Sequence, residues 1–370
     1  MRVAFRVDAS SRIGTGHLMR CLTLADALKS RGALTRFICR HLPRSLWAQF
    51  SLKGHELVLL KSSIENEQIN DLDHSHWLGV NQSQDAYDTL RALSDQEWNW
   101  LIVDHYALDV RWETILHQII KKIMAIDDLA DRQHDCDILL DQNYFLDMNK
   151  RYVKRVPLTC KVFLGPNYAL LHPSYAELHE VIRPRDKVKR ILVFFGGSDR
   201  DNLTGRAIEA LLSLERDDIE VDVVLPIHSP YVEEIEQLAA GHATLKCHKA
   251  LPTLAPLMAS SDLAIGAMGA TTWERLCLGL PTIAVTLAKN QTEVTAALHK
   301  ESLVVWIGHS KTVTKESIAI QLMGIIKVND LGSWSIRCME LCDGKGTNRI
   351  VEHLYLSMQT NQSGCNTTTC

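Results

Sequence analysis

Short apolar runs alternate along this chain with segments whose apolar residues recur at helical spacing. The first run, at 2–8, is followed by a loop of small residues at 10–16. An apolar face with spacings of three and four then appears at Leu18, Cys21, Leu22, Ala25 and Leu28. This spacing predicts a helix that ends before Gly32. The chain therefore begins as a strand, a glycine-containing loop and a helix.

The same alternation continues through two stretches of the chain. In the first stretch we predict a helix around 110–120 and further strands at 34–39, 56–60, 99–104 and 122–127. The pattern pauses between about 164 and 189, where three prolines and mixed charge suggest a connector. It restarts with predicted strands at 188–195, 220–225, 243–247, 262–267, 282–287 and 303–306.

Alternating strands and helices predict parallel sheets covered by helices on both faces. We therefore expect an α/β fold of two Rossmann-like domains that face each other across a cleft. The expected divisions are an N-terminal domain at 1–165, a connector at 166–187, a C-terminal domain at 188–358 and a disordered tail at 359–370.

Composition and charge exclude several broad classes of protein. The 370 residues are 46% hydrophobic and 23% charged, which is typical of a globular chain. The net charge of −4 argues against a nucleic-acid or membrane-surface partner. A basic cluster between Arg183 and Arg190 is interpreted as a solvated linker. With no 18-residue apolar run and an early charge in the N-terminal segment, we expect a cytoplasmic protein. We also expect it to be a monomer.

The cysteines do not form a recognisable metal-binding pattern. None of the ten cysteines belongs to a C-x-x-C pair, and Cys338 and Cys342 lack further partners at zinc spacing. We therefore interpret them as reduced thiols of the core. The nearest acidic pair, Asp127-Asp128, is interpreted as a strand-end turn. Neither a metal ion nor a cofactor is expected.

Ligands of open parallel sheets bind beyond the carboxyl ends of the strands, which directs attention to the residues after each predicted strand. After the first strand comes a loop with Gly14 and Gly16, followed by His17 at the start of a helix. Glycines allow a ligand to approach the backbone, and the free N–H groups of a helix start attract phosphate. The positive end of the helix dipole favours a neutral histidine, which can accept a proton. The alternative is a glycine turn beside an exposed histidine.

Two further strand ends carry candidate chemistry. Asp104 and Tyr106 lie at the carboxyl end of a predicted strand, where they can hydrogen-bond a sugar or orient a catalytic histidine. A strand-end Asp is also an ordinary turn residue. In 266–275 a strand enters a glycine loop and a helix, and Glu274 can accept hydrogen bonds from a ribose diol. The alternative is that Thr271 and Glu274 form a capping box, which needs no ligand.

Seven short motifs, in this order and spacing, resemble a known family over residues 1–355. They are Phe5-Arg6-Val7-Asp8-Ala9-Ser10, Ile13-Gly14-Thr15-Gly16-His17-Leu18-Met19-Arg20, Asp104-His105-Tyr106, Phe194-Phe195-Gly196-Gly197-Ser198-Asp199, Thr271-Thr272-Trp273-Glu274, Asn290-Gln291 and Asp343-Gly344-Lys345-Gly346. Together they resemble the UDP-2,4-diacetamido-2,4,6-trideoxy-β-L-altropyranose hydrolases of pseudaminic acid biosynthesis. That family is similar to glycosyltransferases of the B type.

The resemblance implies a site divided between the two domains. UDP would bind mainly to the C-terminal domain and the sugar would face the N-terminal one, with no metal ion involved. The family's catalytic histidine falls on His17 and its ribose-binding carboxylate on Glu274, while Tyr106 lies near the sugar. The other implied substrate contacts are Gly14, Gly16, His172, Gly197, Ser198, Gly269, Thr271, Thr272, Asn290 and Gln291.

One position departs from the family pattern. Many relatives carry arginine where this chain has His172, and arginine is a permanent, forked phosphate ligand. Either this chain holds the diphosphate more weakly or another group compensates.

The expected reaction is hydrolysis of a UDP-sugar. His17 would accept the proton of a water that attacks the anomeric carbon directly, so the sugar would leave with inverted configuration. Three alternatives remain open: a UDP-sugar glycosyltransferase, a hydrolysing epimerase on the same scaffold, and a non-catalytic nucleotide-sugar-binding subunit.

Overall fold

The computed structural model describes residues 1–10, 12–61, 72–226, 229–249, 251–328 and 330–359. The tail that we expected to be disordered from 359 onward therefore lies almost wholly outside the described residues. The chain divides into two compact units. Unit 1 comprises 1–143, 147–170 and 345–370, and unit 2 comprises 144–146 and 171–344.

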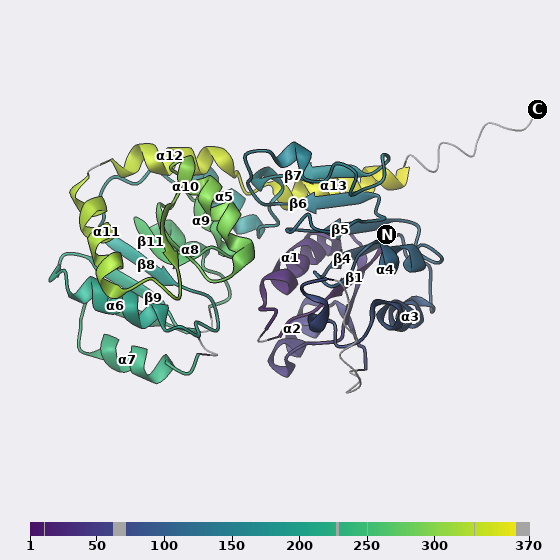
Figure 1. Cartoon of the computed structure of the whole chain (residues 1–370), viewed down its shortest axis with the longest axis horizontal. Coiled ribbons are helices and arrows are strands. Elements are labelled where there is room, and N and C mark those ends of the chain that lie inside the picture. The colour runs from purple at the N-terminus through teal and green to yellow at the C-terminus, as the bar shows by residue number, and fades with distance from the viewer. Residues whose placement is uncertain (11, 62–71, 227–228, 250, 329, 360–370) are drawn as a thin grey trace, which may run out of the picture. The chain divides into compact units, whose positions relative to one another are not determined.

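Unit 1 is built on a seven-stranded sheet in the order β3-β2-β1-β4-β5-β6-β7 (Figure 1). Every neighbouring pair of these strands is parallel. The strands are β1 (Arg2–Val7), β2 (Leu34–Cys39), β3 (Glu56–Leu59), β4 (Trp100–Asp104), β5 (Ile123–Ile126), β6 (Ile138–Asp141) and β7 (Lys161–Leu164).

Helices cover both faces of this sheet because successive strand side chains point to opposite sides. Val3, Phe5 and Val7 of β1 enter one core, and Ala4 enters the other. The first core is completed by α1 (Gly16–Ser30), α2 (Trp47–Lys53) and α13 (Gly346–Gln359). The second is completed by α3 (Gln82–Leu93) and α4 (Val110–Leu116). Short 3-10 turns are η1 (Arg44–Leu46), η2 (Ser75–Trp77), η3 (Met148–Lys150) and η4 (Pro166–Tyr168).

Unit 2 repeats this architecture with a six-stranded parallel sheet in the order β10-β9-β8-β11-β12-β13. Its strands are β8 (Arg190–Phe194), β9 (Glu220–Val224), β10 (Leu245–His248), β11 (Leu263–Ala267), β12 (Thr282–Thr286) and β13 (Val305–His309). One core includes residues of α6 (Leu203–Leu212), α7 (Val232–Ala240) and α11 (Lys315–Lys327). The remaining helices are α5 (Pro173–Val181), α8 (Ala255–Ser260), α9 (Thr271–Cys277), α10 (Thr292–Lys300) and α12 (Leu331–Leu341), with η5 at Lys289–Gln291.

The two predicted parallel sheets are confirmed, and each predicted strand is present within a few residues. β6 and β7, which have four residues each, were not predicted. We expected a connector at 166–187, but this segment contains α5, which has His172 as its N-cap and Pro173 in its first turn. Proline is favoured at a first helical position because that N–H has no partner to lose.

The interpretation of the basic cluster as solvated is wrong for Arg185. Its side chain is buried and donates to the carbonyl oxygens of Met258, Ser261 and Leu278. Burial lowers the pKa of Arg185 to about 10. These hydrogen bonds connect the segment before β8 with the C-terminal ends of α8 and α9.

The C-terminal helix does not belong to the domain in which we expected it. We expected 188–358 to form one domain, but α13 belongs to unit 1 and lies beside β6 and β7 in Figure 1. Its residues Ile350, Val351 and Leu354 are buried in the core of that unit. The Trp100 indole N–H donates to the Leu354 carbonyl at 3.3 Å. The apolar face of α13 is buried in the core of unit 1, where the helix packs against α1 and η4, and this packing assigns it to unit 1.

Among the described residues, no helix has the length and apolar character needed to cross a membrane.

Candidate active site

In each unit the strand order reverses direction at one point, and the candidate residues gather there. In unit 1 the chain proceeds from β1 to β2 and β3 on one side, then returns to β4 on the other. Open α/β sheets bind ligands at such a switch point, beyond the strand carboxyl ends. His17 lies shortly after β1, and Asp104 is the last residue of β4, paired in register with Val7.

His17 and Asp104 form a hydrogen-bonded pair. The His17 Nδ1 atom lies 2.6 Å from Asp104 Oδ1, and the Asp104 side chain is fully buried. Because the carboxylate only accepts, Nδ1 carries the proton and donates it. The opposite ring nitrogen, Nε2, is then an acceptor, and it has no hydrogen-bond partner among the described residues. The histidine is 11% exposed.

Arg20 holds the Asp104 carboxylate from the other side. Its guanidinium donates to both Asp104 oxygens, at 2.6 and 2.7 Å, and reaches both oxygens of Asp128 at 3.0 and 2.8 Å. The Tyr106 hydroxyl donates to Asp128 at 2.7 Å, and Asn143 donates to the same carboxylate at 2.9 Å. These contacts hold the Asp104 carboxylate, and with it the His17 ring, in a fixed position.

The charges of this cluster fix its protonation. Burial opposes ionisation of Asp104, but the Arg20 guanidinium and the His17 contact hold the pKa of that carboxyl well below its usual range. Burial, reinforced by the negative charge of Asp128, raises the pKa of the Tyr106 hydroxyl well above its usual value. At neutral pH, Asp104 is therefore an anion and Tyr106 a neutral donor.

The loop before His17 exposes backbone amides. Gly14 has a φ of +82°, a conformation that favours glycine, and its amide bonds to the Ser10 carbonyl at 2.8 Å. Helix α1 starts at Gly16, and its N-cap Thr15 makes no side-chain capping bond. The amides of 16–18 have no partner among the described residues. Both predicted glycines and His17 thus lie around a helix start that has no side-chain cap.

The equivalent switch point of unit 2 lies between β8 and β11. Gly197 and Ser198, both exposed, follow β8, while Gly269 lies between β11 and α9. A Cβ at Gly266 would lie 2.5 Å from the Phe194 carbonyl oxygen, so these two strands approach too closely for a larger residue. The predicted glycine-rich turns are therefore neighbours at one sheet edge.

Glu274 is oriented by a tyrosine. The Tyr175 hydroxyl of α5 donates to the Glu274 carboxyl at 2.7 Å. Burial raises the pKa of Glu274 to about 7. The capping-box alternative is wrong, because the N-cap of α9 is Ala270 and the Thr271 hydroxyl accepts from Arg275 at 3.2 Å.

The other predicted contacts of unit 2 have structural partners of their own. The Thr272 hydroxyl is buried beside Met268. Asn290 is exposed in η5, whereas the Gln291 side chain accepts from the Leu287 amide at 2.7 Å. The exposed His172 caps α5, with Nδ1 2.9 Å from the Ser174 hydroxyl. No interaction joins His172 to Glu274 directly, but Tyr175 links the same helix to that carboxylate.

Sequence reasoning missed Arg20, Asp128, Asn143 and Tyr175 as site residues. Arg20 had a usable signal, because it lies three residues after His17 and so on the same helix face. Asp128 belongs to the pair that we interpreted as a turn. That interpretation holds for Asp127, which accepts from the Leu129 and Ala130 amides. Over the residues that the structure describes, no three His, Cys, Asp or Glu side chains are grouped as metal ligands.

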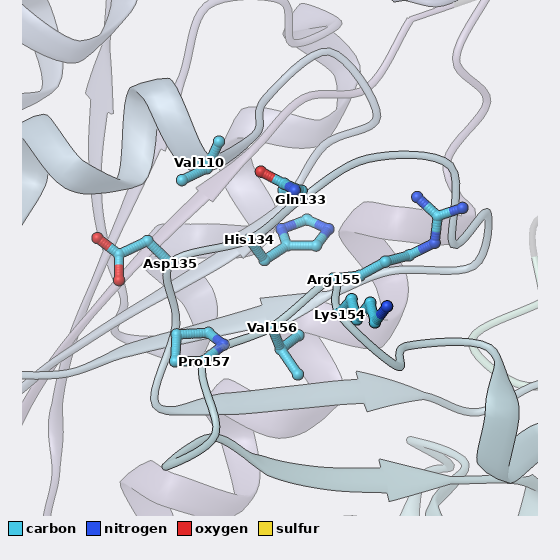
Figure 2. A pocket seen from close by; sticks show the side chains of 8 residues that line it. All are labelled: Val110, Gln133, His134, Asp135, Lys154, Arg155, Val156 and Pro157. Atoms are coloured by element: carbon cyan, nitrogen blue, oxygen red, sulfur yellow. The ribbon is translucent and has the colours of Figure 1, made fainter.

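A separate hollow of about 250 Å³ opens elsewhere on unit 1. Figure 2 shows its lining, which consists of Val110, Gln133, His134, Asp135, Lys154, Arg155, Val156 and Pro157. It contains none of the predicted site residues, and its volume is below the usual range of ligand pockets, which begins at about 300 Å³. The histidine in it is engaged with Glu113 at 2.7 Å. We therefore place one group of candidate site residues at the switch point of each unit.

The chain has relatives among characterised proteins. It is 26% identical over 302 residues to a UDP-2,4-diacetamido-2,4,6-trideoxy-beta-L-altropyranose hydrolase of Campylobacter jejuni, which covers 81% of this chain and 97% of that protein. The motif-based resemblance is confirmed. The chain is also 22% identical over 367 residues to the spore coat polysaccharide biosynthesis protein SpsG of Bacillus subtilis, with 96% and 99% covered. No protein-family model matches.

A third relative is longer than this chain. It is an uncharacterized protein, MJ1062, of Methanocaldococcus jannaschii, 26% identical over 291 residues. The match covers 76% of this chain but only 55% of that protein, so the chain spans about half its length.

Solved structures establish the fold class. MurG of Acinetobacter baumannii has a TM-score of 0.65 at 15% identity, with 96% of this chain and 99% of that chain covered. Phytolacca americana UGT2, complexed with UDP-2-fluoro-glucose and pterostilbene, has a TM-score of 0.67 at 13% identity, with 96% and 99% covered. The predicted fold of two Rossmann-like domains, as in glycosyltransferases of the B type, is confirmed.

Proposed function

We propose that this protein hydrolyses a UDP-linked diacetamido-trideoxy hexose to the free sugar and UDP, as a step of pseudaminic or related nonulosonic acid biosynthesis. The observation that carries the proposal is the buried Asp104 carboxylate that fixes His17 with Nε2 as a proton acceptor. The hydrolase relative from Campylobacter jejuni supports the choice of substrate.

The proposed reaction is a single displacement. The oxygen of a water bonds to the anomeric carbon while the bond from that carbon to the UDP oxygen breaks. His17 Nε2 takes one proton of the water, and UDP leaves with the electron pair. Positioned bases of this kind typically contribute about 10²–10⁴-fold to the rate. Attack from the face opposite UDP inverts the anomeric configuration.

The negative charge that develops on UDP would be met by backbone amides in unit 2. Gly197, Ser198, Gly269 and Thr271 lie at the switch point, where loop amides and a strand-end turn suit a diphosphate. Glu274 would accept hydrogen bonds from the ribose diol, with Tyr175 holding the carboxyl in place. Asn290, Gln291 and His172 are proposed as outer contacts of the nucleotide and its phosphates.

Incubation with UDP-sugars in the absence of an acceptor tests the proposal. The expected result is stoichiometric release of UDP and free sugar, with the inverted anomer seen first by NMR. Turnover only after addition of an acceptor would instead identify a transferase, which the fold also accommodates. Tight binding without any product would identify a nucleotide-sugar-binding subunit.

Glu274→Gln is expected to weaken UDP binding by about 1–3 kcal/mol at pH 8, because the ribose diol loses a charged acceptor. The carboxyl has a pKa of about 7 in the free protein and must ionise to accept both hydroxyls. UDP affinity of the unchanged protein should therefore rise about tenfold between pH 6 and pH 8, and this rise should be absent from the variant. Isothermal titration at several pH values measures both effects.

UDP itself titrates near the lower end of this range, so the difference between the two proteins carries the result. Glu233→Gln, on the exposed first turn of α7, is the matched control and should behave as the unchanged protein. Identical pH profiles for Glu274→Gln and the unchanged protein would refute the ribose contact.

We propose that hydrolysis needs no divalent metal ion. The carboxylates nearest the strand ends of unit 1 are already engaged, Asp127 by Arg132 and Asp128 by Arg20. Turnover should persist after exhaustive EDTA treatment and should not increase greatly with added Mg²⁺. Loss of activity in EDTA that a divalent ion restores would contradict this mechanism.

A further inference from the structure

Aromatic side chains line the described surroundings of His17. The Tyr106 ring lies 4.6 Å from the His17 ring, edge to face at 87°, and Trp77 of η2 stacks on Tyr106 at 5.4 Å and 24°. His74 contacts both, with ring centroids 4.5 Å from Trp77 and 5.2 Å from Tyr106. Trp77 and His17 are 6.5 Å apart. We call His74, Trp77 and Tyr106 the aromatic wall.

The polar groups beside the aromatic wall are already hydrogen-bonded to one another. The Tyr106 hydroxyl is donated to Asp128, and Asp128 also receives Arg20 and Asn143. Asp104 is shared by His17 and Arg20. A sugar that presents many hydroxyls here would find few unpaired partners, and each buried hydroxyl without one would cost free energy.

The wall differs in accessibility from one ring to the next. Tyr106 is only 5% exposed, so its ring is mostly covered by its neighbours. Trp77 and His74 are both half-buried, and the indole is the larger surface. Arg132 lies over the Tyr106 ring at 5.9 Å, whereas no cation of the described residues lies over the Trp77 ring. Trp77 is therefore the ring that can meet a ligand directly.

We propose that Trp77 is a specificity-determining residue, whose ring contacts the methyl and C–H surface of the sugar beside His17. This wall would favour deoxy sugars with acetamido groups over sugars with free hydroxyls at the same positions. The proposal rests on the proposed function, because it assumes that a UDP-sugar occupies the His17 site. Apolar pockets discriminate by single groups only moderately, about 10–200-fold.

Direct binding tests this role separately from hydrolysis. In a His17→Ala background, which is expected to slow turnover at least ~10²-fold, a UDP-2,4-diacetamido-2,4,6-trideoxy-hexose, UDP-N-acetylglucosamine and UDP are titrated calorimetrically. Trp77→Ala should weaken binding of the first ligand about 3- to 10-fold, the scale of one aromatic contact, and leave UDP affinity unchanged. Trp77→Phe should retain most of the affinity. The preference for the deoxy sugar over UDP-N-acetylglucosamine should shrink in Trp77→Ala only.

Trp47→Ala is the matched control, since Trp47 is another half-buried tryptophan of unit 1 that does not contact the wall. A thermal melt checks that each variant folds. If Trp77→Ala weakens the binding of UDP and of the UDP-sugars equally, or weakens the binding of none of them, the proposed role of Trp77 is wrong. Failure of the unchanged protein to hydrolyse any UDP-sugar would refute the proposed function, and the binding series would still decide the proposal on Trp77.

Discussion

Replacing His17 by alanine should lower turnover of the UDP-sugar by at least ~10²-fold, because the variant lacks the proton acceptor for the attacking water. UDP affinity should stay within about twofold, since the proposed nucleotide contacts all belong to unit 2. The removed ring makes one hydrogen bond to Asp104, and Arg20 still neutralises that carboxylate. Single-turnover kinetics and UDP titration measure the two effects.

His242→Ala is a suitable control for this variant, because His242 is exposed and no side-chain contact of it is found among the described residues. It should turn over at the rate of the unchanged protein. Near-normal turnover in His17→Ala would remove the histidine from the mechanism, and the hydrolytic proposal would need another base.

Asp104→Asn should reduce kcat by about 10²–10⁴-fold with little change in KM, through the protonation of His17 rather than through a substrate contact. An asparagine can present its N–H₂ group to Nδ1, and the histidine then carries its proton on Nε2, where it can no longer accept one. Asp104 is thus a positioning residue. Steady-state kinetics over a range of pH, with a thermal melt for each variant, make the comparison.

The informative control is Asp128→Asn. It removes the second carboxylate from Arg20 but keeps the carboxylate partner of His17. Its loss of kcat should stay below about tenfold, or about 1.4 kcal/mol, which is the upper end of the net contribution of one ordinary hydrogen bond. If both variants lose kcat equally, the cluster acts as a structural unit, and the proposal that Asp104 keeps the His17 proton on Nδ1 fails.

The sequence predicted the fold because its main signals are local. Buried parallel strands appear as apolar runs, and the strand ends carry glycines or acids at both switch points. His17, Asp104 and Glu274 could therefore be selected before the structure was known. The strands β6 and β7 were missed because no α-helix separates β5, β6 and β7, so the alternation of strand and helix that marks the other strands is absent there.

What the sequence could not give were contacts between distant residues. Asp128 lies 108 positions from Arg20, and Tyr175 lies 99 from Glu274, yet both pairs share hydrogen bonds. Nor can periodicity identify which sheet an amphipathic helix will cover. The apolar face of α13 fits a Rossmann-like domain of either unit, and only the packing of Ile350 and Leu354 assigns it to the first.

That assignment has a consequence for how the protein is made. During synthesis, residues 346–359 are added after the whole of unit 2, yet they complete the hydrophobic core of unit 1. Until α13 has been synthesised, the apolar residues that it covers in unit 1 stay exposed. By then every residue of unit 2 has already been made. Exchange of one unit between relatives likewise cannot use a single crossover, because a transplanted first unit must bring its last helix with it.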